Sequence, residues 1–200
     1  MAKNAIIREI NKAYKAISLN IIKYDSLVAS SVSNVDFLLD LMDQRTCVQQ
    51  ADITKSAIGQ LDCFKQKLVY KIDSEISYKM EVIAGVANEL MLIAGDISSS
   101  YLKCGRLIQK HDNELNDECL FESHTTAPSI SDLMAQLDEI CVWYTTRTVD
   151  VSSKLTRVSP DATNELRSLR LLWRIPFKWR QRLKQMETGF EAVKRYAETL

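Results

Sequence analysis

The stretch of sequence that decides the fold is residues 10–42, INKAYKAISLNIIKYDSLVASSVSNVDFLLDLM. Its apolar side chains recur at alternating steps of three and four residues, a mean step of about 3.5 that keeps one face of a long helix against a partner helix. The repeat consists of Ile10, Tyr14, Ile17, Ile21, Tyr24, Val28, Ser31, Val35, Leu38 and Met42. The pattern predicts a first helix over residues 4–44, with a bend or fraying at its weakest portion, residues 30–34.

A second helical pattern begins near Ile53 and extends to about residue 110. Its phase slips at Ile72 and Ile76, which indicates either a stutter in one continuous helix or a tight break near Asp73 and Ser74. We favour one continuous helix. Three glycines lie off its apolar stripe. The favoured interpretation is that they are surface glycines which the helix tolerates, and the alternative is that they allow another backbone to approach closely. They are Gly85, Gly95 and Gly105.

The last 73 residues of the chain contain all of its prolines, Pro128, Pro160 and Pro176. Apolar repeats between them predict a third long helix over residues 130–158, a short helix ending near Trp173, and a last helix over about residues 178–198. The predicted fold is all-α, an elongated antiparallel helical bundle or coiled coil with three long helices and a short C-terminal helical hairpin. We expect a single domain over residues 1–200, with an acidic flexible loop at about residues 111–128.

The first predicted helix is longer than the third helix that could cover it. We therefore expect one of its ends to be exposed and available to a partner helix. The apolar residues at these ends are Ile6, Ile7 and Ile10 on one side and Leu38, Leu39 and Met42 on the other.

Composition excludes a strong global electrostatic field, because 26 basic residues balance 26 acidic residues. Residues 111–146 hold eight acids and no Lys or Arg, whereas residues 165–195 hold nine bases and three acids. The N-terminus has no apolar signal-like segment, and no stretch is long and apolar enough to cross a membrane. The five cysteines are widely spaced and odd in number, which favours a reduced intracellular compartment.

Residues able to carry chemistry are few. The two histidines, His111 and His124, lie in or beside the expected loop, where surface exposure is the favoured interpretation. A metal site built from His111, Cys119 and His124 is disfavoured because its spacings do not form a zinc knuckle. The five glycines are isolated from one another, so the sequence contains no glycine-rich phosphate-binding motif. We expect no catalytic residues, no cofactor and no metal, and therefore no enzyme.

The C-terminal region alternates apolar and basic side chains. Its apolar members include Leu169, Leu171, Leu172, Trp173, Ile175, Phe177 and Trp179, and its bases are Arg167, Arg170, Arg174, Lys178, Arg180, Arg182 and Lys184. We call residues 167–184 the basic-aromatic strip. The favoured interpretation is that Trp173 and Phe177 close the open end of the bundle. The alternatives are a protein interface or single-stranded nucleic-acid binding. Intramolecular pairing of the bases with the nearby acidic loop would weaken the case for nucleic acid.

Two segments resemble the cyclin-dependent-kinase-interacting protein family, CINP. Residues 21–27, IIKYDSL, are similar to the family's Ile-Leu-Lys-Trp-Glu-Thr-Leu, with Tyr24 in place of Trp. A Leu-rich third helix with Leu137, Glu139, Val151 and Leu155 precedes a segment that ends in Trp173 and the Pro176-Phe177 pair. Only two residues separate Trp173 from Pro176, where the family has three.

The start of the third long helix, with Pro128, Ser129, Asp132 and Leu133, also resembles the AAA-ATPase-interacting ribosome maturation factor family, AIRIM. Both resemblances imply an adaptor within a nuclear AAA-ATPase assembly associated with chromatin replication and maturation of the large ribosomal subunit. The CINP resemblance further implies contact with a cyclin-dependent kinase and genome-checkpoint proteins.

The leading hypothesis is a non-catalytic nuclear adaptor of an AAA-ATPase complex in DNA replication, genome maintenance and checkpoint control, with a further role in ribosome maturation and some presence in the cytoplasm. It would bind a sister helical subunit and the ATPase, without direct nucleic-acid or membrane binding. We assign helix pairing to Tyr24 and Leu27, and anchoring or docking to Trp173, Pro176 and Phe177. The alternatives are the sister ribosome-biogenesis factor, a coiled-coil subunit of a cytoskeletal or kinetochore assembly, and a nucleic-acid-binding protein.

Overall fold

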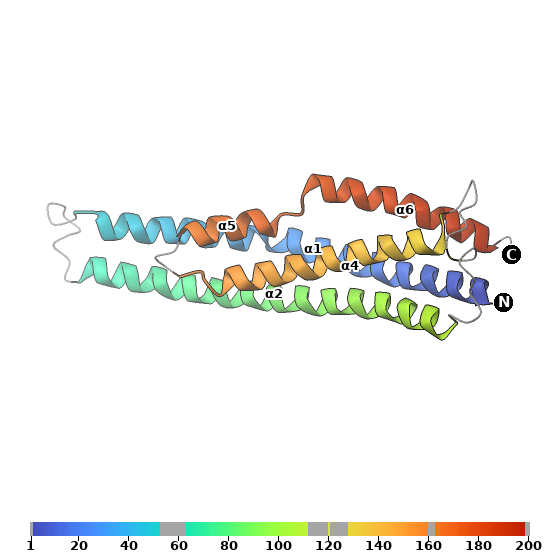
Figure 1. Cartoon of the computed structure of the whole chain (residues 1–200). Coiled ribbons are helices and arrows are strands. Elements are labelled where there is room, and N and C mark those ends of the chain that lie inside the picture. Colours follow the sequence, from blue (N-terminus) through green and yellow to red (C-terminus); the bar gives the residue numbers. More distant parts are fainter. Residues whose placement is uncertain (1, 53–62, 112–119, 121–127, 160–162, 199–200) are drawn as a thin grey trace. The chain divides into compact units, whose positions relative to one another are not determined.

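The computed structural model describes residues 2–52, 63–111, 120, 128–159 and 163–198, and their regular structure is entirely helical (Figure 1). This confirms the predicted all-α helical bundle. The described helices are α1 (Ala2–Gln50), α2 (Phe64–Lys110), α4 (Ile130–Leu155), α5 (Thr163–Trp173) and α6 (Phe177–Glu198).

The helix bounds lie close to those that the apolar repeats predict. Helix α1 continues through residues 30–34 without a break, so the predicted bend or fraying there is wrong. The Ser31 hydroxyl donates to the Leu27 carbonyl of the same helix at 2.7 Å. Helix α2 continues through Asp73, so the phase slip is a stutter in one helix, as favoured. The predicted helix start near Ile53 and most of the predicted acidic loop lie outside the described residues.

The chain forms two compact units, and each contains part of α1, α2 and α4. Unit 1 comprises Met1–Ser26, Leu90–Thr148 and Ile175–Leu200, so its fourth helix is α6. Unit 2 comprises Leu27–Glu89 and Val149–Arg174, so its fourth helix is α5. The single-domain organisation stays a prediction.

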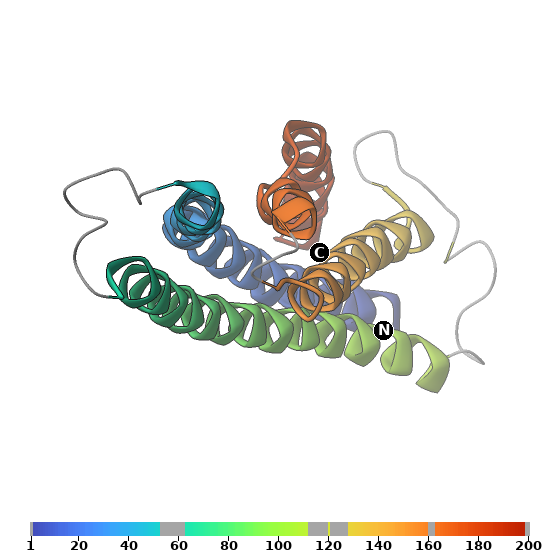
Figure 2. The same ribbon diagram turned by 90° about the vertical axis from the view of Figure 1, so that its left-hand side faces the viewer.

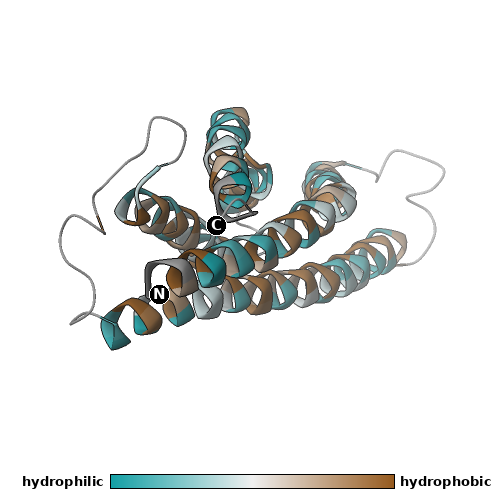
Figure 3. Cartoon of the chain, turned by 90° about the vertical axis from the view of Figure 1, so that its right-hand side faces the viewer, coloured by the Kyte–Doolittle hydropathy of each residue, from teal (hydrophilic) through white to brown (hydrophobic). Residues whose placement is uncertain are grey.

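The core of unit 1 is built from one face of each of its four helical segments. The buried residues include Ile6, Ile10, Ile17 and Tyr24 from α1, Leu90, Ala94, Ile97 and Cys104 from α2, Leu133, Leu137, Ile140 and Tyr144 from α4, and Met186, Phe190 and Val193 from α6. Hydrophobic residues recur along each helix between hydrophilic ones, as Figure 3 shows in brown and teal. This recurrence is the amphipathic pattern from which the sequence predicts packed helices.

The core of unit 2 has the same construction with α5 in place of α6. The buried residues include Val28, Val35, Leu38 and Met42 from α1, Ile72, Ile76, Ile83 and Ala87 from α2, Val151 and Leu155 from α4, and Leu166, Leu169 and Trp173 from α5. Figure 2 shows the four segments of this unit around a common centre.

The prediction that one end of the first helix is exposed is wrong. Ile6, Ile7 and Ile10 are buried in unit 1, and Leu38 and Met42 are buried in unit 2. Leu39 is half-buried. The prediction considered only the third helix as a cover for the first. In the structure, α6 in unit 1 and α5 in unit 2 also pack with the first helix and help to bury its apolar face.

Among the described helices, none is long and apolar enough to cross a membrane.

Candidate interaction site

Tyr24 pairs α1 with α4 inside unit 1. Its ring is fully buried and lies edge-on to Tyr144, with 4.8 Å between centroids. The Tyr24 and Thr148 hydroxyls are hydrogen-bonded at 3.2 Å, and Thr148 also donates to the Tyr144 carbonyl at 2.8 Å. Burial raises the pKa of Tyr24, so the hydroxyl stays protonated. The described contacts of Tyr24 are therefore those of a helix-pairing residue within this chain.

An aromatic cluster extends this contact to α6. The Trp143 and Trp179 rings stack at 4.5 Å, and the Arg147 guanidinium lies over Trp143 at 4.9 Å. The Tyr144 ring meets Trp179 edge-on at 6.2 Å. Sequence reasoning missed the Trp143–Trp179 pair because Trp143 lies one residue off the stripe that runs through Tyr144. Stacking of this kind stabilises beyond simple burial, by about 0.5–1.5 kcal/mol per pair.

A carboxyl group lies next to this cluster. Asp25 Oδ1 is buried and has no hydrogen-bond partner among the described residues. Burial raises the pKa of Asp25, and the nearby Arg180 and Arg147 guanidinium groups oppose that shift. Burial also raises the pKa of Tyr144, and the Asp25 charge adds to that shift. The arrangement holds a carboxyl beside aromatic rings rather than beside a nucleophile and its base.

Trp173 joins α5 to α1 in unit 2 through packing and a hydrogen bond. The indole is only 2% exposed, and its Nε1 donates to the Ser31 hydroxyl at 2.8 Å. The hydrogen bond explains how polar Ser31 occupies a buried position in the apolar stripe. Trp173 is buried as expected, whereas its closing of an open end of the bundle stays a prediction.

Arginines of α5 and the residue that follows it bind carboxylates of α1. Arg170 Nε lies 2.5 Å from Asp36 Oδ1, and Arg174 lies 3.8 Å from the same carboxylate. Arg167 lies 3.9 Å from Asp43. These arginines form one half of the basic-aromatic strip, and they pair with α1 rather than with the acidic region after residue 111 that the sequence suggested.

The other half of the strip lies on α6. Arg182 binds the Glu139 carboxylate of α4 with two bonds of 3.0 and 2.8 Å. These bonds lower the pKa of Glu139 and raise that of Arg182. Glu139 lies on α4, beyond the acidic loop that the sequence suggests as a partner of the strip, so pairing with that loop stays a prediction. The loop itself lies outside the described residues.

The remaining predicted docking residues differ in exposure. The Phe177 side chain is 73% exposed, so it does not fill the core, contrary to the favoured interpretation. Pro176 is exposed, and its carbonyl accepts bonds from the Trp179 and Arg180 amides at 3.1 and 3.3 Å at the start of α6. Leu27 is half-buried. Pro176 and Phe177 are thus the two predicted docking residues that a partner can reach directly.

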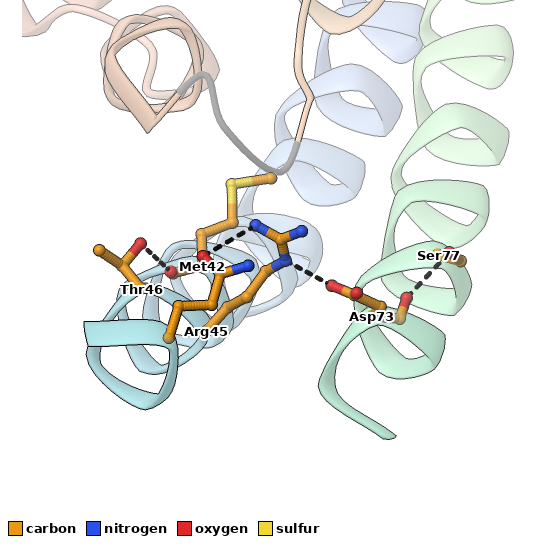
Figure 4. Close-up of polar contacts among 6 residues, drawn as sticks. Met42, Arg45, Thr46, Asp73 and Ser77 are labelled. Atoms are coloured by element: carbon orange, nitrogen blue, oxygen red, sulfur yellow. Dashed lines mark hydrogen bonds and ion pairs between the residues drawn. The ribbon is translucent and has the colours of Figure 1, made fainter. Parts of the chain in front are cut away.

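The α1–α2 pair of unit 2 is held by polar contacts at its ends. Arg45 reaches from α1 to Asp73 of α2, with Nε and Oδ1 2.6 Å apart (Figure 4). Lys65 donates to the Gln49 and Ala51 carbonyls at 2.7 and 2.9 Å. Helix α1 has no basic residue in its own last turn, so Lys65 of α2 supplies the positive charge that a helix C-terminus favours.

Candidate metal ligands do not converge in the part of the chain that the structure describes. No group of three or more His, Cys, Asp or Glu side chains there could hold a metal ion. Of the trio considered from the sequence, His111 is described, whereas Cys119 and His124 lie outside the described residues. Cys104 is buried on the apolar stripe of α2, and burial raises the pKa of its thiol to about 11, which keeps it protonated.

Comparison with known proteins identifies the family. Residues 4–189 match the family model described as CA109-like, ribosome biogenesis protein C1orf109-like. The chain belongs to this family. The match agrees with the ribosome-maturation part of the sequence resemblance, and the other implied roles stay predictions. A search of individual curated proteins gives no match.

Proposed function

We propose that this protein is a non-catalytic helical adaptor that acts in maturation of the large ribosomal subunit, as a subunit of a nuclear AAA-ATPase complex. The observation that carries the proposal is the match to a ribosome biogenesis family over residues 4–189. The resemblance of residues 128–133 and of the segment around Trp173 to the ribosome maturation factors supports the ATPase partner.

A non-catalytic role is supported by what the ionisable and aromatic side chains do. Tyr24 and Trp173, which the sequence singles out, use their polar atoms to join helices through Thr148 and Ser31. The Arg170 guanidinium binds Asp36 of α1. These groups are occupied in packing rather than aimed into a shared pocket where a substrate could meet them.

Direct nucleic-acid binding is the weaker candidate. Stacking on single-stranded bases needs accessible aromatic rings. Trp173 and Trp179, the two tryptophans of the basic-aromatic strip, are both buried. Four bases of the strip pair with carboxylates of α1 and α4, namely Arg167, Arg170, Arg174 and Arg182. The replication, checkpoint and kinase contacts and the cytoskeletal or kinetochore alternative rest on the sequence alone.

Phe177 is the residue through which we expect the adaptor to bind. It is a large apolar side chain at the exposed start of α6, next to exposed Pro176, and exposed aromatic residues are frequent anchors of protein interfaces. Tyr70 of α2 is a matched control, because its aromatic side chain is 77% exposed and the sequence does not mark it for docking.

Affinity purification of the tagged protein from nuclear extract tests the proposal. We expect recovery of an AAA ATPase and a second small helical subunit with the wild type and with Tyr70→Ser, and at least about tenfold less of each with Phe177→Ser. Recovery of neither protein with the wild type would refute the proposed complex. Equal recovery with both variants would refute the docking role of Phe177 and leave the complex intact.

A further inference from the structure

Helix α2 carries a second stripe on the face opposite the core of unit 1. Its core stripe is Leu90, Ala94, Ile97 and Cys104, all buried. The second stripe is Leu92, Gly95, Ser99 and Leu102, at steps of three, four and three residues, and we call it the outer seam. This spacing is that of the a and d positions of a coiled coil.

The outer seam is open. Leu92 is 72% exposed and Leu102 is 51% exposed. A methyl group added to Gly95 would meet no atom within 4 Å, so no described residue covers the middle of the seam. An apolar helix face of this kind is typical of a surface that pairs with another helix.

Two exposed charges flank the seam on one side, Asp96 and Lys103. Neither forms an ion pair with another residue in the described part of the chain. They are seven residues apart, about 10 Å along the helix, so they cannot pair with each other. In a coiled coil they occupy equivalent flanking positions, where charges choose the partner and its direction.

The sequence of the seam complements itself only when two copies run antiparallel. In that register Leu92 of one copy faces Leu102 of the other, and Gly95 faces Ser99, each twice because of the two-fold axis near Ile97. The same register places Asp96 of each copy beside Lys103 of the other. In a parallel pair in register, each of these two positions would instead face an uncharged position of the other copy, Met91 or Ser98, and no such ion pair would form.

We propose that the outer seam of α2 binds a second copy of this chain through an antiparallel, two-fold symmetric helix pair. The seam spans only about three helical turns, so its buried area falls below that of a standard stable interface. The expected dimer is weak, with a dissociation constant on the order of micromolar to tens of micromolar. Gly95 and Ser99 lie at the centre of the pair, where small side chains let the two backbones approach closely.

Sedimentation equilibrium of the full chain tests the pairing with charge variants that disturb no described contact of the monomer. Asp96→Lys makes both of these positions positive, and Lys103→Asp makes both negative. Each variant alone should dimerise at least about tenfold more weakly than the wild type. An equimolar mixture of the two variants, and the double variant D96K/K103D, restore opposite charges and should recover association.

The control is Asp150→Lys on α4, which changes the net charge by the same amount at another exposed position and should leave the dimer unchanged. Circular dichroism establishes that each variant keeps its helical content. Wild-type protein that stays monomeric at about 100 μM would overturn the proposal. A mixture of Asp96→Lys and Lys103→Asp that associates no better than either variant alone would overturn it equally.

Discussion

At the residue scale, the buried polar groups show why the sequence specifies these helix pairings. Trp173 Nε1 donates to the Ser31 hydroxyl, and the Tyr24 and Thr148 hydroxyls are hydrogen-bonded, so these two buried aromatic residues each have a polar partner on another helix. A shifted register would bury these groups without partners, at a cost of about 1–3 kcal/mol each. The hydrogen bonds therefore add specificity to packing that apolar burial alone would leave loosely defined.

Trp173→Ala should lower the free energy of unfolding by about 3–5 kcal/mol, because it leaves a cavity between α5 and α1 and removes the bond to Ser31. The matched control is Leu171→Ala on the same helix, where the side chain is exposed and the change should stay within about 0.5 kcal/mol. Urea denaturation followed by circular dichroism measures the difference. Equal effects of the two variants would contradict the burial of Trp173.

Asp25 and Glu139 should affect stability in opposite directions. Burial raises the pKa of Asp25 above its ordinary 3.8, so its ionisation costs stability near neutral pH. The bonds from Arg182 lower the pKa of Glu139 below its ordinary 4.5, so its carboxylate contributes stability near neutral pH. We expect Asp25→Asn to raise the free energy of unfolding near neutral pH, and Glu139→Gln to lower it by up to about 1 kcal/mol.

The pH dependence separates these two effects. The gain from Asp25→Asn should shrink as the pH falls through the raised pKa of Asp25 in the folded protein, and vanish below 3.8. The loss from Glu139→Gln should stay constant down to about pH 4.5 and then disappear. Denaturation curves at a series of pH values give both trends. Variants that change stability with the same sign near neutral pH would contradict this assignment.

At the element scale, the apolar repeats were sufficient to predict where the helices lie. The repeat from Ile10 to Met42 predicts a helix that the structure extends to Ala2–Gln50, and the stutter near Asp73 does not interrupt α2. Which helices pair could not be predicted, because that depends on contacts between distant residues. Arg170 and Asp36 are 134 residues apart, and no periodicity within either helix links them.

Some residues of the candidate site could be predicted from the sequence and others could not. The repeat predicted a helix contact at Tyr24 correctly, because Ile17 and Val28 of the same repeat are also buried, although Ile21 is only half-buried. Phe177 was misjudged as a core residue, since hydrophobicity predicts burial only when the helix face is also known. Helix α6 begins at Phe177, so too few preceding helical residues define its face.

The Arg45–Asp73 contact predicts an energetic coupling between α1 and α2. Since the Arg45 side chain is only 14% exposed, solvent screens this pair less than the other ion pairs described. A double-mutant cycle with Arg45→Ala and Asp73→Ala should give a coupling energy of about 0.5–2 kcal/mol. The same cycle on Arg167 and Asp43, which are both exposed and 3.9 Å apart, is the control and should give about 0–0.5 kcal/mol. Equal coupling in the two cycles would show that the Arg45 contact is not specific.

The glycines of α2 predict a gain in stability. A methyl group added at Gly85 meets no atom within 4 Å, so Gly85→Ala should raise the free energy of unfolding by about 0.5–1 kcal/mol through helix propensity alone. At Gly189 the added methyl group would lie 3.4 Å from Gln136 Oε1, so Gly189→Ala should gain less. Thermal denaturation compares the two variants. A loss of stability in Gly85→Ala would show that another surface covers this position.

At the scale of the whole molecule, charge and apolar surface are divided between internal packing and a few exposed positions. Net charge is zero, and the bases of the basic-aromatic strip largely pair with carboxylates of the same chain. What stays exposed includes Phe177 at the start of α6 and the outer seam of α2. These exposed apolar positions are the surfaces on which the proposed adaptor role depends.

The most direct test of the central claim is the ratio of large-subunit to small-subunit ribosomal RNA precursors after depletion of this protein from cells. We predict that large-subunit precursors accumulate and that re-expressed wild type or Tyr70→Ser restores the ratio, whereas Phe177→Ser does not. An unchanged ratio after depletion would contradict the role in large-subunit maturation. Full rescue by Phe177→Ser would contradict its action through this docking residue.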